Sequence, residues 1–565
     1  MKRFAVFAVS VMFVNSISAA VAAGDKACQV GKLAEWQRNV VIAGTDRAIF
    51  IEKNKLKAGE KAEDFDFSFG ATIGQILRSA NQSDSKANRV AVVKSLIDSF
   101  KLTKAPHPLG SREVAISPRL KESSIDPAKL LDESSPEGLH PIGLFNRFDQ
   151  APEDWQYCGE HRIVFAQGQR GADGLLTGPL GTLNRFFLIF EAAVANPRPD
   201  LQKEGCRPAA DLWLGLKQLG TDTHKVAERL HRFYFKGLSA PNGVVIPPVI
   251  HARHYGNPFG QVRGNTFKQL PWELREWHVE LSTGKFLPAP VGTNPQPAFY
   301  TPPETNVSGI DPAVKKAFQE VFVKRVVADA VASNQGLADR PADEQQTHLV
   351  NRNGVRGNLI AAFNDFVSDA GPPPRNDDPN QSENRTGAFR EAVKNKIDEL
   401  KPPTAGGSAS GVSIDEVMNR VGATSCGGCH QFSAKQPANP ADQIGTSSDN
   451  KPIVWPRSLG FVHIDETSRL SPLLTDFFLA DRCENLNELF GKPAPPFDEL
   501  AARTLFLTER TKLPTEILQE FAKTVPNLNQ NQVRALNSAT SQLNRDARQD
   551  DRARLGASGR IRQAD

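Results

Sequence analysis

Two thiols and an imidazole stand together at Cys426-Gly427-Gly428-Cys429-His430. Two cysteines separated by two residues can each add to one vinyl group of a haem, forming two thioether bonds. The imidazole of the adjacent His430 then becomes the proximal ligand of the iron. This spacing predicts one covalently attached haem c, held by Cys426 and Cys429, with His430 on the iron.

Two other uses of the cysteine pair need different surroundings. A structural zinc site requires two further ligands at matching spacing, and the sequence contains no second Cys-x-x-Cys. A thioredoxin-like redox pair would follow a strand in a βαβ unit. The residues before Cys426 instead have the pattern of a helix, so both alternatives are less favoured than haem.

The segment before the motif has the features of a helix with a defined start. Ser413 and Glu416 have the spacing of a capping box. Apolar residues then recur at helical spacing, at Ile414, Val417, Met418 and Val421. A helix that leads into Cys-x-x-Cys-His resembles the start of class I c-type cytochrome domains, over residues 411–485 at most. The resemblance implies thioether attachment through Cys426 and Cys429 and iron ligation by His430.

The chain departs from the common form of that family at the other axial position. Such domains usually carry a Met well after the haem motif, whereas this chain has only Met1, Met12 and Met418. Met418 lies on the apolar face of its helix and is interpreted as a core residue. His463 is the candidate distal iron ligand; the alternative is a core histidine hydrogen-bonded to a carbonyl.

The distal ligand determines which chemistry the iron can perform. Two histidine ligands would give a six-coordinate, low-spin iron suited to electron transfer at a lower potential than a His/Met pair. An open sixth position would instead admit peroxide, oxygen or nitric oxide and permit catalysis.

The first 23 residues have the organisation of an export signal. Met1-Lys2-Arg3 is basic, residues 4–14 are apolar, and small residues follow up to Ala23. The apolar run is too short to span a bilayer, which needs about 20 residues. We therefore expect a periplasmic or secreted protein with no transmembrane anchor after signal removal, which agrees with attachment of haem c on the exported side in bacteria.

Four cysteines lie outside the haem motif, at Cys28, Cys158, Cys206 and Cys483. In an oxidising compartment these cysteines are expected to form two disulfides, with three possible connectivities. The expected pairs are Cys158–Cys206, which flank one candidate β unit, and Cys28–Cys483.

The charge balance argues against a nucleic-acid partner. The formal net charge is +4, and no basic run with interleaved aromatic residues is present. The partner expected for a haem protein of this kind is a redox protein, whose identity the sequence does not give.

Composition and periodicity predict an α+β multidomain chain. A mixed antiparallel β unit is flanked by helical regions and followed by a mainly α-helical cytochrome c-like domain. The predicted segments are a signal peptide (1–23), a helical N-terminal region (24–105), an extended connection (106–141), a β-rich mixed domain (142–305), a helical region (306–400), a linker (401–412), the haem c domain with following helices (413–526) and a polar, disordered tail (527–565).

Several individual elements follow from local patterns. Val93 to Phe100 has a helical apolar stripe, and residues 162–166 and 185–190 are strand-like runs. Helices are also predicted over residues 223–235, 311–333 and 355–370. Alternation changes phase between Arg275 and Trp277, which predicts a bulged strand.

Three functional interpretations remain. The first is an exported monohaem c-type cytochrome that transfers single electrons. The second is a haem-dependent, peroxidase-like oxidoreductase whose substrate is held by the β-rich domain. The third is an exported binding or surface protein without haem. Residues 144–165 and 260–276 resemble parts of large exported bacterial proteins of unknown activity, and this resemblance implies no reaction.

Overall fold

A seven-stranded antiparallel sheet forms the centre of this protein, seen in a computed structural model. The structure describes residues 28, 37–106, 113–152, 154–177, 185–239, 244–256, 259–292, 294–295, 297–304, 312–334, 336–337, 339–353, 387–400, 411–434, 442–458 and 461–491. The predicted signal peptide, most of the linker, the helix at 355–370 and the polar tail lie outside these residues. The described part has both helices and a large antiparallel sheet, so the chain is α+β.

The strand order in the sheet is β1-β4-β5-β8-β11-β12-β13, and every neighbouring pair is antiparallel. The strands are β1 (Val41–Ile42), β4 (Leu139–Arg147), β5 (Tyr157–Gln167), β8 (Phe186–Ala195), β11 (Gln261–Thr266), β12 (Glu273–Val279) and β13 (Phe286–Ala289). The two strand-like runs predicted from the sequence lie within β5 and β8. The edge strand β1 comes from the N-terminal region that was expected to be helical.

The expected bulge in the strand around Trp272–Leu281 is wrong. β12 pairs with β11 over five consecutive residues, and no register shift interrupts the pairing. Six of its seven residues are buried, from both faces of the sheet. Because both faces are covered, apolar residues need not alternate along the strand, and the apparent phase change follows from that.

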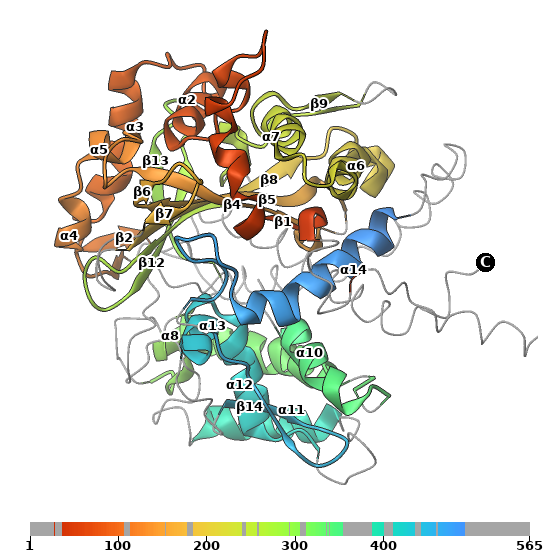
Figure 1. The fold of residues 1–565 in the computed structure, drawn as a ribbon. Helices are drawn as coiled ribbons and strands as arrows, with labels where there is room; N and C mark the ends of the chain where they lie inside the picture. The colour runs from red at the N-terminus through yellow and green to blue at the C-terminus, as the bar shows by residue number, and fades with distance from the viewer. Residues whose placement is uncertain are drawn as a thin grey trace, which may run out of the picture.

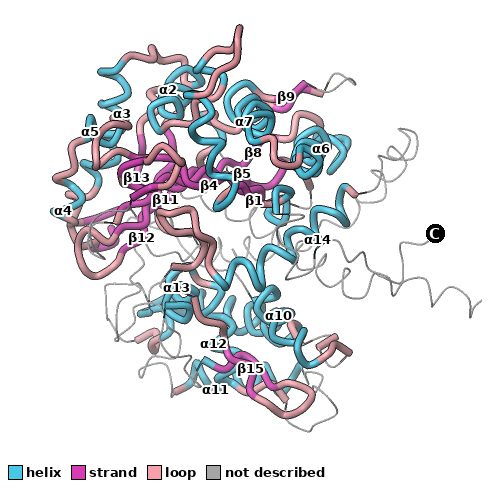
Figure 2. The backbone as a smooth tube through the Cα atoms, in the orientation of Figure 1, coloured by secondary structure: helices cyan, strands magenta, loops and turns pink. Residues whose placement is uncertain are grey.

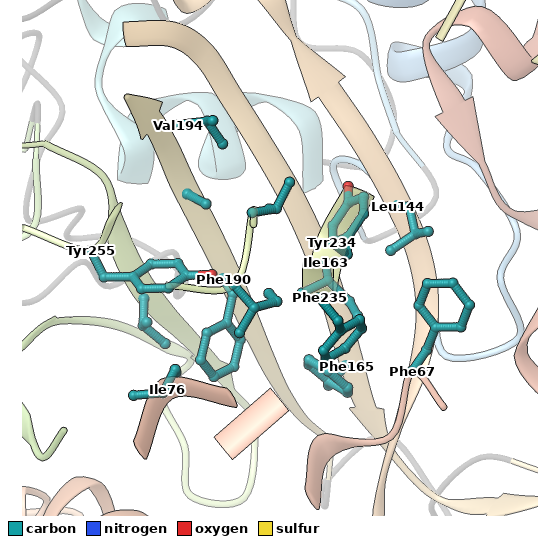
Figure 3. Close-up of a cluster of buried hydrophobic side chains, with 14 of the residues drawn as sticks. Phe67, Ile76, Leu144, Ile163, Phe165, Phe190, Val194, Tyr234, Phe235 and Tyr255 are labelled. Carbon is teal, nitrogen blue, oxygen red and sulfur yellow. The ribbon is translucent and has the colours of Figure 1, made fainter. Parts of the chain in front are cut away.

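One face of the sheet is covered by helices of the N-terminal half (Figures 1 and 2). These are α2 (Phe69–Ser79), α3 (Lys86–Ser99), α6 (Arg207–Leu216) and α7 (Thr223–His231). Ser68, Ser85 and Asp222 cap three of them by accepting a backbone N–H of the first turn. Figure 3 shows part of the resulting core, which includes Phe67, Ile76, Leu144, Ile163, Phe165, Phe190, Val194, Tyr234, Phe235 and Tyr255.

Helices of the C-terminal half form a second body beyond the opposite face of the sheet, visible below it in Figure 1. They are α8 (Pro312–Val321), α9 (Val327–Ala332), α10 (Ala342–Asn353), α11 (Ala388–Leu400), α12 (Ile414–Thr424) and α13 (Cys426–Ala434), followed by the hairpin of β14 (Gln443–Thr446) and β15 (Pro452–Val454). The last helix, α14 (Leu479–Phe490), runs between this body and the sheet.

The remaining elements are short. Two helical turns, α4 (Leu120–Ser123) and α5 (Pro127–Leu131), lie in the connection that was expected to be extended. The small hairpins are β2 (Lys104–Pro106) with β3 (Glu113–Ala115), β6 (Gln169–Arg170) with β7 (Leu176–Thr177), and β9 (Leu238–Ser239) with β10 (Val245–Ile246). The 3-10 helices are η2 (Gln37–Asn39), η3 (Gly44–Asn54), η4 (Ala62–Asp64), η5 (Phe148–Gln150), η6 (Pro199–Cys206), η7 (Lys217–Leu219), η9 (Ala252–His254) and η10 (Pro297–Tyr300). Three π-helical turns extend neighbouring α-helices: η8 (Arg232–Lys236), η11 (Phe322–Val326) and η16 (Leu474–Phe478).

Two disulfides are present, and both have the pairing expected from the sequence. Cys158–Cys206 joins β5 to the start of α6, and Cys28–Cys483 joins the N-terminal segment to α14. The second crosslink closes a loop with a sequence separation of 455 residues.

Candidate functional site

The Cys-x-x-Cys-His motif lies on α13, directly after a sharp break from α12. The capping box expected at the start of α12 is present, with Ser413 and Glu416 each accepting the other's backbone N–H. Ser425 is extended and separates the two helices. Helical spacing of i, i+3 and i+4 then puts Cys426, Cys429 and His430 within an arc of about 100° on one face of α13.

The beginning of α13 is fixed to the loop that follows β13. The thiol of Cys426 lies 3.1 Å from the carbonyl oxygen of Gly292. The backbone N–H of Gly427 donates to Oδ1 of Asn294, also at 3.1 Å. These contacts attach the motif to the sheet, because β13 is the sheet's edge strand.

Gly428 permits the close approach of the two helices. Its N–H donates to Oγ of Ser425 at 2.9 Å. A Cβ added to Gly428 would lie 2.0 Å from the carbonyl oxygen of Gly422 at the end of α12. The glycine is therefore required by space.

The imidazole of His430 stacks on the indole of Trp272, just before β12. The ring centroids are 4.6 Å apart and the planes are inclined by 21°. Burial, with a smaller contribution from the charge of Arg263, lowers the pKa of His430 to about 4. The ring is therefore neutral near pH 7, which is the protonation state that ligates iron.

Trp272 is positioned by a buried ion pair from the segment that was expected to be an extended connection. Arg119 pairs with Glu122 at 2.7 Å and also donates to the carbonyl oxygens of Pro271 and Gln269. Glu122 in turn accepts the backbone N–H of Gln269 at 3.1 Å. Together the two side chains fix the turn that leads into Trp272.

His463 lies between η16 and the charged part of the sheet. Its ring is half-buried, with the ring centroid 6.4 Å from that of Phe478. Burial, followed by the positive charge of Arg482 and a contribution from His430, holds the pKa of His463 well below its ordinary value. The contribution from His430 means that the two imidazoles lie within electrostatic range of each other.

Within the described part of the chain, no hydrogen-bond partner reaches a ring nitrogen of His430 or His463. Three buried histidines of the described chain differ, since a ring nitrogen of each is bound by protein: His161 to Trp213, His254 to the carbonyl of Val249 and His348 to the carbonyl of Ser333. Among the described residues, no carbonyl oxygen is bound to the His463 ring.

Charged side chains occupy the sheet face that is turned toward the motif. Arg162 on β5 pairs with Glu191 on β8 at 2.9 Å, and Arg263 on β11 pairs with Glu276 on β12 at 3.0 Å. Glu276 also accepts the backbone N–H of Gly292, the residue whose carbonyl faces Cys426. The cross-strand ion pairs are thus connected to the motif through Glu276 and Gly292.

The six cysteines fall into two chemical classes. Four form the disulfides, whereas Cys426 and Cys429 both remain thiols and are buried. Burial raises the pKa of Cys429 to about 12, so this thiol is protonated near neutral pH. Among the described residues, no group of three or more His, Cys, Asp or Glu side chains is arranged to hold a metal ion directly. A haem site needs no such group, because the porphyrin supplies four of the iron ligands.

The other residues considered as ligands from the sequence lie in the core or in a turn, where they are packed or hydrogen-bonded. Met418 is fully buried in the core that α12 forms with α8, α9 and α11, as expected for a core residue. His251 and His254 lie in a short 3-10 turn, where His254 is bound to backbone groups of Val249 and Ala195. Trp272 and Asn294 gave no signal in the sequence, because each contacts the motif only through tertiary folding.

No protein-family model, curated protein or solved structure matches this chain. The function must therefore be argued from the site. Among the described helices, none combines the length and apolar character needed to cross a bilayer.

Proposed function

We propose that this chain is an exported monohaem c-type cytochrome that transfers single electrons. The observation that carries the proposal is the face of α13, where two thiols excluded from both disulfides and an imidazole without a hydrogen-bond partner in the described structure lie together. The two disulfides are compatible with an oxidising compartment. The resemblance of the motif and its preceding helix to class I c-type cytochromes supports the same assignment.

The chain's own residues perform distinct tasks in this proposal. Cys426 and Cys429 would hold the haem through thioether bonds, and His430 would bind the iron. When bound, the haem supplies an iron that accepts and releases one electron. Trp272 limits rotation of the His430 ring through stacking, and Gly292 and Asn294 fix the helix that carries the motif. The buried surroundings exclude water, which favours the less charged state of the iron.

Haem attachment is tested by producing the full chain in a bacterium that carries out haem c maturation. We expect haem staining that survives denaturing electrophoresis and a mass increase of one haem. The double variant Cys426→Ala/Cys429→Ala should lose both signals. The double variant Cys158→Ala/Cys206→Ala, which also removes two sulfurs, should keep the haem. A wild-type protein with the mass of the bare polypeptide would contradict the proposal.

We further propose that His463 is the distal ligand, giving a six-coordinate, low-spin iron. The support is the half-buried ring, which no described residue binds and whose pKa is lowered by burial and by nearby groups that include Arg482 and His430. In the His463→Ala protein, the visible spectrum should change to that of a high-spin, five-coordinate haem and carbon monoxide should bind the reduced form. His348→Ala is the matched control, because that imidazole is bound by a backbone carbonyl.

Carbon monoxide binding to the reduced wild-type protein would contradict a histidine at the sixth position. It would instead favour the haem-dependent oxidoreductase, since an exchangeable position is what peroxide chemistry needs.

A further inference from the structure

Arg482 on α14 is a buried guanidinium whose charge is not matched by the chain around it. The residue is 8% exposed. Among the described residues, no carboxylate lies within 4.0 Å of its nitrogens, and its guanidinium carbon lies 5.6 Å from the centroid of the Phe478 ring. Stacking on an aromatic face recovers only about 1–2 kcal/mol, less than the cost of burying a charge.

The nearby carboxylates already serve other cations. The carboxylate of Asp149 accepts hydrogen bonds from Nε of Arg147 at 2.9 and 3.0 Å, one to each oxygen. A terminal guanidinium nitrogen of Arg147 lies 2.7 Å from Oδ2 of the same carboxylate. Glu160 and Glu191 both pair with Arg162. The other carboxylate whose charge reaches Arg482 is the adjacent Asp481, which is exposed to solvent.

Electrostatics at Arg482 agree with this arrangement. Burial holds the pKa of its guanidinium well below its ordinary value, and the charge of Arg147 acts in the same direction. Asp149 and Asp481 oppose these effects without overcoming them. An anion placed beside Arg482 would restore the balance, and a carboxylate matches the planar guanidinium with two parallel hydrogen bonds.

We propose that Arg482 binds a carboxylate that the described chain does not supply, beside the Phe478 ring on which the guanidinium stacks. His463 and Arg482 both lie near the Phe478 ring, at 6.4 and 5.6 Å. The carboxylate therefore lies next to the histidine proposed for the iron. Its two possible sources are a haem propionate, which rests on the proposed function, and a small organic acid.

The site joins distant parts of the chain. Arg482 comes from α14, whereas the cations beside it come from β4 and β5, more than 300 residues earlier. The cytochrome-like resemblance ends near residue 485. The charge that holds the carboxylate would therefore depend on the contact between that region and the sheet, and not on the haem motif alone.

The test compares Arg482→Met in the haem-loaded protein and in the haem-free Cys426→Ala/Cys429→Ala protein. Without haem and without added carboxylate, the substitution should leave the melting temperature unchanged or raise it, because it removes an unmatched buried charge. In the loaded protein it should lower the melting temperature by several degrees and make the reduction potential more negative. Arg482→Lys should give an intermediate result.

Matched controls separate the outcomes. Arg253→Met removes an exposed arginine that has no side-chain partner among the described residues, and it should change none of these quantities. If a small organic acid is the ligand, acetate or succinate should raise the melting temperature of the haem-free protein, and Arg482→Met should abolish that rise. This experiment can also be done if no haem attaches. Failure of the cytochrome proposal can therefore be distinguished from failure of the carboxylate site.

One result would overturn the carboxylate site. If Arg482→Met destabilises the haem-free protein in carboxylate-free buffer as strongly as it does the loaded protein, the chain itself satisfies the guanidinium.

Discussion

Gly428 is the residue on which the geometry of the motif most directly depends. The sequence identifies the two cysteines and the histidine by their chemistry, but the residues between them are unspecified in a Cys-x-x-Cys-His pattern. In this protein one of those two positions has no room for a side chain, because the end of α12 lies against it. The identity of that residue is set by packing and not by haem chemistry.

Gly428→Ala should therefore destabilise the protein and reduce haem attachment. The added Cβ would lie 2.0 Å from a backbone oxygen that cannot move without displacing α12, and overpacking of this kind costs about 1–3 kcal/mol. Urea unfolding gives the change in stability and haem staining gives the yield. As a control, Gly215→Ala lies in α6, with its nearest side-chain atom 3.8 Å away, and should stabilise by about 0.5–1 kcal/mol. Equal effects of the two substitutions would contradict this interpretation.

Trp272 illustrates what a sequence does not reveal about a site. The motif, the capping box at Ser413 and the core position of Met418 are all local patterns, and the structure contains them as expected. The stack of His430 on Trp272 depends on a contact between residues 158 positions apart, for which no local pattern exists. The same reason explains why Asn294 and Arg119 were not anticipated.

The helices and strands were predictable where one of their faces is exposed. The stripe from Val93 to Phe100 marks α3 because its other face is in water. β12 was misread because both of its faces are covered, so the alternation that defines strand phase is lost. α4 and α5 were missed because each is about one turn long, too short to show a period.

Arg420 holds three elements of the C-terminal half together. From α12 it donates to the carbonyl oxygens of Ile444 on β14 and Ala330 on α9, at 2.6 and 2.7 Å, and to Oδ1 of Asn334 at 2.7 Å. The side chain is fully buried, and burial lowers its pKa to about 10. It remains charged near neutral pH, so these acceptors bind a cation.

Arg420→Met should cost at least about 2 kcal/mol, since several buried acceptors lose their donor. The loss should be read from the midpoint of urea unfolding at pH 7. Arg253→Met, which removes an exposed arginine with no side-chain partner among the described residues, should change stability by less than about 0.5 kcal/mol. A fall below 1 kcal/mol for Arg420→Met would mean that water or neighbouring groups replace the guanidinium.

The two halves of the chain are joined at several separate places. Cys28–Cys483 connects the ends of the described chain. In addition, the side chains of Lys203 and Arg207 donate hydrogen bonds to the carbonyl oxygens of Leu489 and Phe490, at the end of α14. Because the sheet and the C-terminal helices are connected in this way, the stability of the haem region is expected to depend on the N-terminal half.

The N-terminal half carries buried histidines that should make the whole molecule sensitive to acid. Burial lowers the pKa of His231 and His254 from 6.5 to about 4, and that of His161 to about 3. These rings are neutral in the folded protein at pH 5, whereas the unfolded chain takes up protons there. The stabilisation from each group is therefore complete above pH 6.5 and is lost as the pH falls toward 4.

We expect the free energy of unfolding to fall by at least about 3 kcal/mol between pH 7 and pH 4, which is the contribution of one histidine whose pKa drops from 6.5 to about 4. Urea midpoints at pH 7, 5.5 and 4 provide the measurement. His224 supplies a control of opposite sign: burial lowers its pKa, but hydrogen bonds to Glu60 and Glu52 outweigh that effect and raise it. Its contribution is present at low pH and is lost as the pH rises, so His224→Gln should destabilise more at pH 5.5 than at pH 8. A flat profile across this range in the parent protein would mean that water reaches the buried rings.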